Sequence, residues 1–228
     1  MISIFIPVHN EGLIIEENTN KIIKFLNSKD INYEILFGEN GSVDNTLKLV
    51  KKLNKKDPDK IKYITCNKRG IGRVFRRLIT EYNFNYLVTV DMDLSHDLNF
   101  IIEATELLKK GYDIVIGFKK GVNQKRLWYR KLFTNVNILM CRYLLGLPYK
   151  DFGAGAKSYS SEFLKGKENY IDNLSFFTTK LFFYGKKEKA KISQVPVYCS
   201  DTRKSKLNVV TLPLYITYHI IKFALIRK

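Results

Sequence analysis

The stretch Tyr86-Leu87-Val88-Thr89-Val90-Asp91-Met92-Asp93-Leu94-Ser95-His96 decides the fold, because it joins a short apolar run to an acidic segment. The apolar run has the length and the β-branched composition of a buried strand. Asp91 and Asp93 follow where that strand should end. On an extended chain alternate side chains point to the same side, so both carboxylates would lie together. The stretch therefore predicts either a site for a hard divalent cation or a solvated acidic turn.

Similar apolar runs, each followed by an amphipathic stretch, surround this one. We expect strands at residues 2–8, 33–37, 62–66, 86–90, 113–117 and 192–198. We expect helices at residues 13–26, 42–53, 70–82, 100–109, 127–145 and 174–184. The alternation predicts βαβ units, and hence an α/β, Rossmann-like fold with a mostly parallel central sheet flanked by helices.

Polar loops follow four of the predicted strands. They contain residues 7–11, 38–42, 67–70 and 91–93. Parallel strands end at a common edge of their sheet, and ligands of such sheets bind beyond that edge. We therefore expect the four loops to form one site, which favours the cation site over the acidic turn.

The charge of the chain points to anionic partners. Its 39 Lys and Arg residues exceed its 22 Asp and Glu residues, for a net charge of +17. Nucleic acid, anionic lipid headgroups and phosphorylated substrates are attracted by such a field. Most of the excess lies after the acidic motif, at residues 119–131, 186–191 and 203–206. No nucleic-acid-binding module accompanies it, so we expect no nucleic-acid partner.

The chain start and the cysteines favour a cytoplasmic protein. Residues 1–6 are apolar at once, without a basic leader, which predicts a first strand instead of a secretory signal. The three cysteines, Cys66, Cys141 and Cys199, lie far apart without metal-ligand spacing. An odd, dispersed set of this kind is typical of a reducing compartment.

Taken in chain order, several segments resemble the family 2 glycosyltransferases with the GT-A fold, most closely the dolichyl-phosphate or polyprenyl-phosphate hexose synthases. The segments are Ile4–Glu11, Glu39–Thr46, Asn67–Gly72, Asp91–His96, Ile116–Lys119, Arg130–Asn137, Asp151–Gly155, Val195–Val197 and Arg203–Leu207. Two of them depart from the family pattern. Glu39-Asn40 stands where the family has an acidic pair, and the segment after Arg203 lacks the family's glycine.

The resemblance implies a nucleotide-sugar donor and a divalent metal, Mg²⁺ or Mn²⁺. The metal would be held by Asp93 and Asp91, with Asp91 meeting either the ribose or the metal. The residues implied to bind the donor are Pro7, His9, Glu11, Glu39, Asn40, Lys68, Gly70, Asp91, Met92 and Asp93. Taken alone, His9 is better explained as a surface loop histidine.

The resemblance also implies a phosphate-bearing acceptor. The implied acceptor-phosphate residues are Lys119, Arg130, Thr134, Arg203, Ser205 and Lys206, and the implied catalytic residues are Asp91, Asp93, Arg130, Lys119 and Asp151. Without the motif order, the cations could equally form a solvated helix face. A phosphomonoester already carries between one and two charges near neutral pH, so it can attack without a general base. Asp151 is the only candidate for such a base.

The last residues differ in composition from the rest of the chain. Residues 209–221 contain no Lys, Arg, Asp or Glu, yet this run is shorter than the about 20 residues that span a bilayer. We expect a catalytic domain at 1–207 and, at 208–228, an amphipathic helix lying in the membrane interface. The alternative is a helix packed on the domain or in a homodimer.

Together these features predict an inverting, metal-dependent glycosyltransferase at the cytoplasmic face of the membrane, bound there peripherally to an anionic surface. The donor is expected to be GDP-mannose first and UDP-glucose second, and the acceptor a dolichyl or polyprenyl phosphate. An enzymatic alternative is a transferase that acts on a glycan or cell-wall hydroxyl, which would need a carboxylate base. A basic nucleic-acid-binding protein is the non-enzymatic alternative, and only the net charge favours it.

Overall fold

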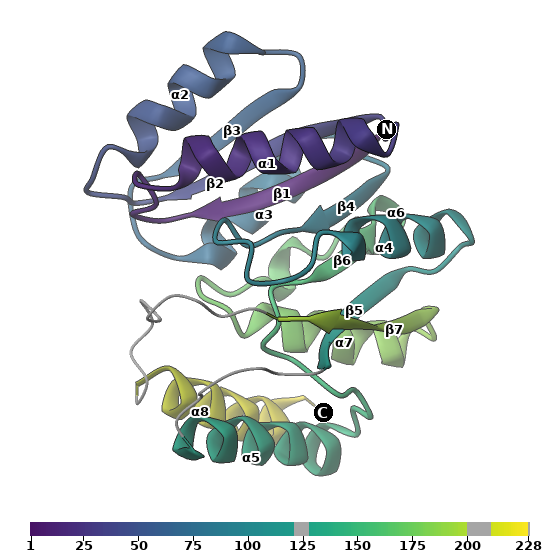
Figure 1. Cartoon of the computed structure of the whole chain (residues 1–228). Helices are drawn as coiled ribbons and strands as arrows, with labels where there is room; N and C mark the ends of the chain where they lie inside the picture. Colours follow the sequence, from purple (N-terminus) through teal and green to yellow (C-terminus); the bar gives the residue numbers. More distant parts are fainter. Residues whose placement is uncertain (121–127, 200–210, 228) are drawn as a thin grey trace.

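The computed structural model describes residues 1–120, 128–199 and 211–227, arranged as one mixed sheet covered by helices (Figure 1). The strands are β1 (Ile2–Val8), β2 (Tyr33–Asn40), β3 (Ile61–Cys66), β4 (Tyr86–Thr89), β5 (Ile114–Lys120), β6 (Lys157–Ser160) and β7 (Ile192–Tyr198). The helices are α1 (Ile15–Ser28), α2 (Thr46–Lys56), α3 (Ile71–Glu81), α4 (Asn99–Lys109), α5 (Trp128–Leu145), α6 (Ser161–Leu164), α7 (Phe177–Lys187) and α8 (Thr211–Ile226), with a 3₁₀ turn, η1, at Glu168–Tyr170.

The seven strands follow the order β3-β2-β1-β4-β6-β5-β7. β1 pairs in parallel with β2 and with β4, and β2 pairs in parallel with β3. β6 is antiparallel to both of its neighbours, and β7 runs parallel to β5. The predicted α/β fold with a mostly parallel sheet is therefore confirmed.

Strand alternation supplies a hydrophobic core on each face of the sheet. In β1, Ile4 and Ile6 point to one face and Phe5 to the other, and all three are almost fully buried. The first face is covered by α1, α2 and α4, and the second by α3, α7 and parts of α5 and α8. Because helices cover both faces, the polar loops lie at the carboxyl ends of the parallel strands.

Some element boundaries differ from the prediction. β2 continues to Asn40 and β5 to Lys120, so Glu39, Asn40 and Lys119 lie on strands and not in loops. The elements β6, α6 and η1 were not predicted at all. β6 has the sequence Lys-Ser-Tyr-Ser, whose polar residues conceal that three of its four positions are buried between β4 and β5.

The predicted C-terminal helix forms as α8 and lies beside α5, at the edge of Figure 1 farthest from α2. The Thr217 hydroxyl donates a hydrogen bond of 2.8 Å to Asn137 of α5. Ile220 and Phe223 are buried, and the Phe223 ring packs edge-on against Phe183 of α7. Within the described residues, no helix combines the length and the apolar character needed to cross a membrane.

Candidate active site at the strand ends

The strand order brings the predicted polar loops to one edge of the sheet. β1 lies between β2 and β4, and its Val8 is level with Glu39 of β2. Asn40 is in turn level with Cys66 of β3. The segments that leave these parallel strands therefore begin side by side. This confirms the expectation that the loops meet at a common edge.

Asn40 ties three of the strand ends together. Its side-chain amide donates to the Val8 carbonyl at 2.9 Å, and its side-chain oxygen accepts the Gly70 N–H at 3.2 Å. The His9 ring nitrogen Nδ1 lies 3.2 Å from the Asn40 carbonyl oxygen. Asn40 is only 6% exposed. Its amide therefore positions the loops, whereas the resemblance implied that Asn40 binds the donor.

The loops after β1 and β2 are joined as one unit. The Asn10 N–H donates to the Ser42 hydroxyl at 3.0 Å, and the Val43 N–H donates to the Asn10 side chain at 2.9 Å. The Glu11 N–H donates to the Thr46 hydroxyl at 2.8 Å. These bonds fix the backbone on which the half-buried side chains of His9 and Glu11 stand.

Close packing holds the loop after β3 in place. A methyl group at Gly70 would lie 2.3 Å from the Asn173 carbonyl oxygen, and one at Gly72 would lie 1.9 Å from that of Asp172. The start of α3 is thus pressed against the segment that precedes α7, and only glycine permits this approach. Lys68, one of the predicted donor residues, is exposed beside this contact.

The acidic motif forms a turn, and the expectation of an extended chain is wrong. The Leu94 N–H donates to the Asp91 carbonyl at 3.0 Å, and Leu94 has a left-handed backbone with φ of 53°. Met92 is 3% exposed and belongs to the core, while Asn18 donates to its carbonyl at 2.9 Å. Only the backbone of Met92 could thus meet a nucleotide. Asp93 is exposed, and its carboxylate accepts the Ser95 N–H at 3.1 Å.

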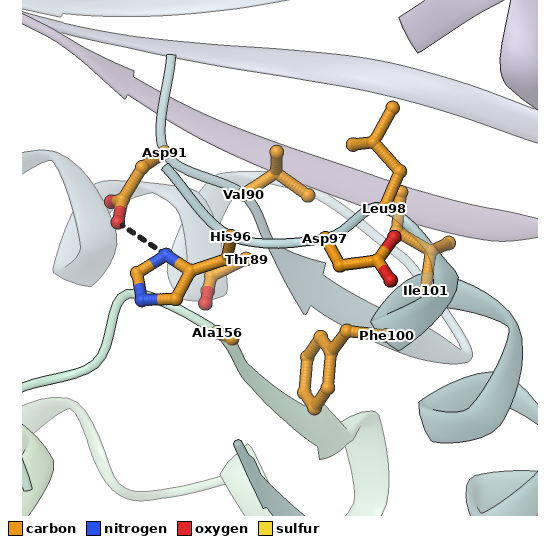
Figure 2. A pocket seen from close by; sticks show the side chains of 9 residues that line it. All are labelled: Thr89, Val90, Asp91, His96, Asp97, Leu98, Phe100, Ile101 and Ala156. Atoms are coloured by element: carbon orange, nitrogen blue, oxygen red, sulfur yellow. Dashed lines mark ion pairs between the residues drawn. The ribbon is translucent and has the colours of Figure 1, made fainter. Parts of the chain in front are cut away.

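His96 pairs with Asp91 behind this turn. The His96 Nδ1 atom lies 3.2 Å from the Asp91 carboxylate, and Figure 2 shows the two side chains facing each other beside a small cavity. Burial opposes the ionisation of Asp91, but His96, Lys157 and Lys119 outweigh it and lower its pKa. Burial also opposes a charged His96. The Asp91 carboxylate and the Cys199 thiol outweigh that cost and raise the His96 pKa to about 9.

The segment before β6 completes the surroundings of Asp91. A methyl group at Gly155 would lie 2.0 Å from an Asp91 carboxylate oxygen, so the backbone here touches that side chain. Lys157, which follows on β6, is 5% exposed and donates to the Ala154 carbonyl. Burial lowers the Lys157 pKa to about 8, even though Asp151 and Asp91 both favour the charged amine.

Asp151 is engaged in the same segment. It is 6% exposed, and one of its carboxylate oxygens accepts the N–H groups of Gly153 at 2.7 Å and Ala154 at 3.0 Å. These bonds shape the turn that carries Gly155 towards Asp91. The carboxylate of the predicted general-base candidate is thus bonded to the backbone of this turn.

Asp91 and Asp93 are oxygen donors of the kind that a divalent metal shared with substrate phosphates prefers. Within the described residues, no group of three or more His, Cys, Asp or Glu side chains is placed to hold a metal ion. A pair consisting of the exposed Asp93 and the ionised Asp91 nevertheless matches the habit of Mg²⁺, which uses one or two carboxylates together with substrate phosphates. The site thus offers oxygen ligands of the type that such a metal takes.

The remaining predicted residues fall into three groups. Pro7 is half-buried in β1, and Lys119 lies near Asp91 at the end of β5. Arg130 and Thr134 lie in the first two turns of α5, which packs chiefly on α8. Arg203, Ser205 and Lys206 lie outside the described residues.

Three residues around Asp91 received no role from the sequence, namely His96, Gly155 and Lys157. The five-residue spacing of His96 from Asp91 was visible, but it has meaning only once the chain turns. Gly155 lies in the small-residue run at 153–156, whose composition permits close backbone approach but does not identify a partner. No sequence signal distinguished Lys157 from the many surface lysines.

Comparison with known proteins identifies similar chains. A family model described as Glycosyl transferase family 2 matches residues 3–184. The chain is 31% identical to dolichol-phosphate mannosyltransferase of Pyrococcus furiosus over 174 residues. That match covers 73% of this chain and 48% of the relative. It is 24% identical to undecaprenyl-phosphate 4-deoxy-4-formamido-L-arabinose transferase of Proteus mirabilis over 159 residues. That match covers 69% of this chain and 48% of the relative. The chain thus spans about half the length of the curated relatives that it matches.

Solved structures share the fold. Glucosyl-3-phosphoglycerate synthase from Mycobacterium tuberculosis, in complex with UDP, matches with a TM-score of 0.73 at 16% identity, over 98% of this chain and 80% of that one. A structure of the same enzyme with Mn²⁺, UDP-glucose and phosphoglyceric acid gives a TM-score of 0.71 at 16% identity, over 98% and 79%. At this identity the likeness establishes the architecture alone.

Proposed function

The chain belongs to glycosyl transferase family 2, and from that premise we propose that it transfers a hexose from a nucleotide diphosphate sugar to a polyprenyl phosphate such as dolichyl phosphate. Its architecture is that of the GT-A glycosyltransferases. The observation that carries the proposal is the Asp91–Asp93 turn at the sheet edge, with cations close to Asp91. Mannose from GDP-mannose is the first donor to test, and glucose from UDP-glucose the second.

The donor would lie along the edge formed by the loops after β1, β2, β3 and β4. His9 and Glu11 stand on the joined loops beside that edge, where a ring and a carboxylate can meet a base and ribose hydroxyls. Asp93 and Asp91 would hold Mg²⁺ or Mn²⁺, which when bound neutralises the charge of the departing nucleotide diphosphate. His96 contacts the Asp91 carboxylate, helps to keep it ionised and orients it for metal binding.

The acceptor is proposed to be a phosphate, which needs cations more than it needs a base. A phosphomonoester is already anionic at neutral pH and can attack the anomeric carbon directly, with inversion. Lys119 lies close enough to Asp91 to lower its pKa, so a cation is available beside the donor phosphates. Asp151 is buried and bonded to backbone N–H groups, which suits a positioning role better than that of a base for a hydroxyl acceptor. Arg130, Thr134, Arg203, Ser205 and Lys206 remain proposed acceptor-phosphate residues.

Two relatives support this acceptor class. The Pyrococcus furiosus protein is named for dolichol phosphate and the Proteus mirabilis protein for undecaprenyl phosphate, both of which are polyprenyl phosphates. We propose that the enzyme acts at the cytoplasmic face of a membrane and is bound there peripherally. The net charge of +17 would then attract substrate phosphates and anionic lipid headgroups. A nucleic-acid partner is not needed to explain this charge.

The direct test incubates the purified protein with a panel of radiolabelled nucleotide sugars, dolichyl phosphate in detergent, and either Mg²⁺ or Mn²⁺. Label should pass into the organic phase with one donor and only when metal is present. Release of the sugar from the lipid product by mild acid would support a phosphodiester link between the sugar and the dolichyl chain.

A parallel reaction offers glycan acceptors that carry free hydroxyls in place of the lipid phosphate. Transfer to the glycan with none to the lipid would overturn the proposed acceptor while preserving the family chemistry. Failure with every donor, under both metals and with both acceptor types, would contradict the proposed activity itself.

A further inference from the structure

The segment that precedes α7 is pressed against the first turns of α3. A methyl group at Gly72 would lie 1.9 Å from the carbonyl oxygen of Asp172 and 2.7 Å from that of Leu174. One turn further along α3, the Arg76 guanidinium donates to the Ile171 carbonyl. These contacts join the two pieces of backbone without room for a side chain at residue 72. A displacement of the segment is therefore passed on to the start of α3, because close-packed structure transmits strain.

The start of α3 belongs to the sheet edge where the donor is proposed to bind. The Arg73 N–H donates to the Gly70 carbonyl at 3.0 Å, and the Gly70 N–H donates to the Asn40 side chain at 3.2 Å. A shift of α3 would thus move the loop after β3, which carries Lys68 and Gly70. Both of these residues are proposed to bind the donor.

The side chain of Asp172 faces two neighbouring helices. One carboxylate oxygen accepts the Leu174 N–H at 2.9 Å and closes the local turn. The other oxygen lies 3.7 Å from the Lys180 amine of α7. Burial raises the pKa of Tyr215, on α8, to about 12, and the nearby Asp172 carboxylate adds to that rise. Asp172 thus meets α3 through its carbonyl group, and α7 and α8 through its carboxylate.

Aromatic rings hold α8 on the same segment. The centre of the His219 ring, on α8, lies 4.2 Å from that of Tyr215 and 5.5 Å from that of Phe176. Phe176 immediately precedes α7 and is 2% exposed. The Phe223 ring of α8 packs edge-on against Phe176, with the ring centres 5.9 Å apart. These rings and the Asp172 carboxylate therefore fix α8 to the segment that is pressed against α3.

We propose that Asp172 is a positioning residue that couples the placement of α8 to the loop after β3. The inference rests on the proposed function, which assigns Lys68 and Gly70 to the donor. Asp172 and Tyr215 act through the backbone contact at Gly72 and do not touch the donor themselves. Such a coupling is reciprocal. Contacts that hold α8 in place favour donor binding, and a bound donor restrains α8.

Steady-state kinetics with the nucleotide sugar as the varied substrate test the coupling. Asp172→Asn removes the charge but keeps the acceptor for the Leu174 N–H, and Tyr215→Phe removes only a hydroxyl from α8. Each variant should raise the KM for the donor by about tenfold, while kcat stays within about twofold of wild type. The double variant should lose less than the product of the two single effects, because both act through one contact. Tyr218→Phe is the matched control, since Tyr218 also lies on α8 but is 57% exposed.

Hydrogen–deuterium exchange gives a measurement that needs no catalysis. The amides of Gly70 and Arg73 should exchange faster in Tyr215→Phe than in wild type, because the start of α3 is held less firmly. Exchange of these amides in Tyr218→Phe should match wild type. Circular dichroism would establish that each variant is folded, and Tyr215→Phe carries the test alone if Asp172→Asn does not fold.

An unchanged donor KM in the folded variants would overturn the inference. A loss confined to kcat, or equal effects of Tyr215→Phe and Tyr218→Phe, would overturn it as well. Absence of sugar transfer by the wild-type protein contradicts the proposed function, and the exchange measurement then decides the coupling by itself. Full transfer by wild type, with unaltered exchange at the start of α3 in Tyr215→Phe, refutes the coupling alone.

Discussion

The backbone at Gly155 touches the carboxylate of Asp91, so that a methyl group at residue 155 would lie 2.0 Å from an Asp91 oxygen. Gly155 precedes β6, which pairs with β4, and β4 leads into Asp91. The contact therefore links the antiparallel strand of the sheet to the carboxylate that we assign to the metal. A side chain at residue 155 must displace Asp91, which is itself held by His96.

We expect Gly155→Ala to lower kcat/KM for sugar transfer by about 100-fold, because a displacement of about 1 Å at a reacting centre can have that effect. Gly153→Ala is the matched control. A methyl group at Gly153 would meet nothing closer than the Asp151 carboxylate at 3.7 Å, an ordinary contact. Steady-state kinetics on both variants would check the prediction. Similar losses in both would show that glycine matters here for the turn and not for Asp91.

Asp93 gives a second test, because it is the more exposed of the two proposed metal ligands. We expect Asp93→Asn to lower metal-dependent turnover by about 100-fold or more, since metal stabilisation of the leaving group is worth several kcal/mol. The melting temperature should stay within a few degrees of wild type. Metal titrations of activity would reveal the change.

Asp97→Asn is the control for this substitution. Asp97 lies nearby, and its side chain accepts the Asn99 N–H at the start of α4 through one oxygen, which asparagine retains. Full metal-dependent activity in Asp93→Asn, or an equal loss in Asp97→Asn, would remove Asp93 from the metal site.

The sequence predicted the strand-end edge but not what surrounds Asp91. Alternation of apolar runs and helices was enough to place the loops at one edge, because parallel strands leave few other arrangements. The turn at Asp91 depends on Asn18 of α1, which holds the Met92 carbonyl from a distant part of the chain. β6 is a strand only because β4 and β5 flank it, and no local property of Lys157 or Ser158 indicates their burial.

His96 should make folding stability fall as the pH rises. Its pKa is raised from 6.5 to about 9 in the folded protein, because the pairing with Asp91 and Cys199 outweighs burial. Below about pH 6.5 the histidine is charged in both states and the full stabilisation is present. Between that pH and about 9 only the folded protein keeps the proton, so the stabilisation is lost as the pH rises.

The difference in unfolding free energy between wild type and His96→Asn should therefore shrink by roughly 2 kcal/mol from pH 6 to pH 9. Urea unfolding in EDTA at the two pH values measures it without metal binding. A difference that stays constant would mean that His96 does not hold a proton against Asp91.

Lys157 should show the opposite slope. Burial lowers its pKa from 10.5 to about 8, so the folded state releases a proton that the unfolded state keeps. Burying the charged amine therefore costs stability at neutral pH, and this cost declines as the pH rises from about 8 towards 10.5.

Lys157→Met keeps most of the volume and removes the titration. Its stability relative to wild type should fall by about 2 kcal/mol between pH 7 and pH 9.5. Urea unfolding of both proteins at pH 7 and pH 9.5 measures this difference. If the stability of Lys157→Met relative to wild type rose with pH, the lowered pKa of Lys157 would be contradicted.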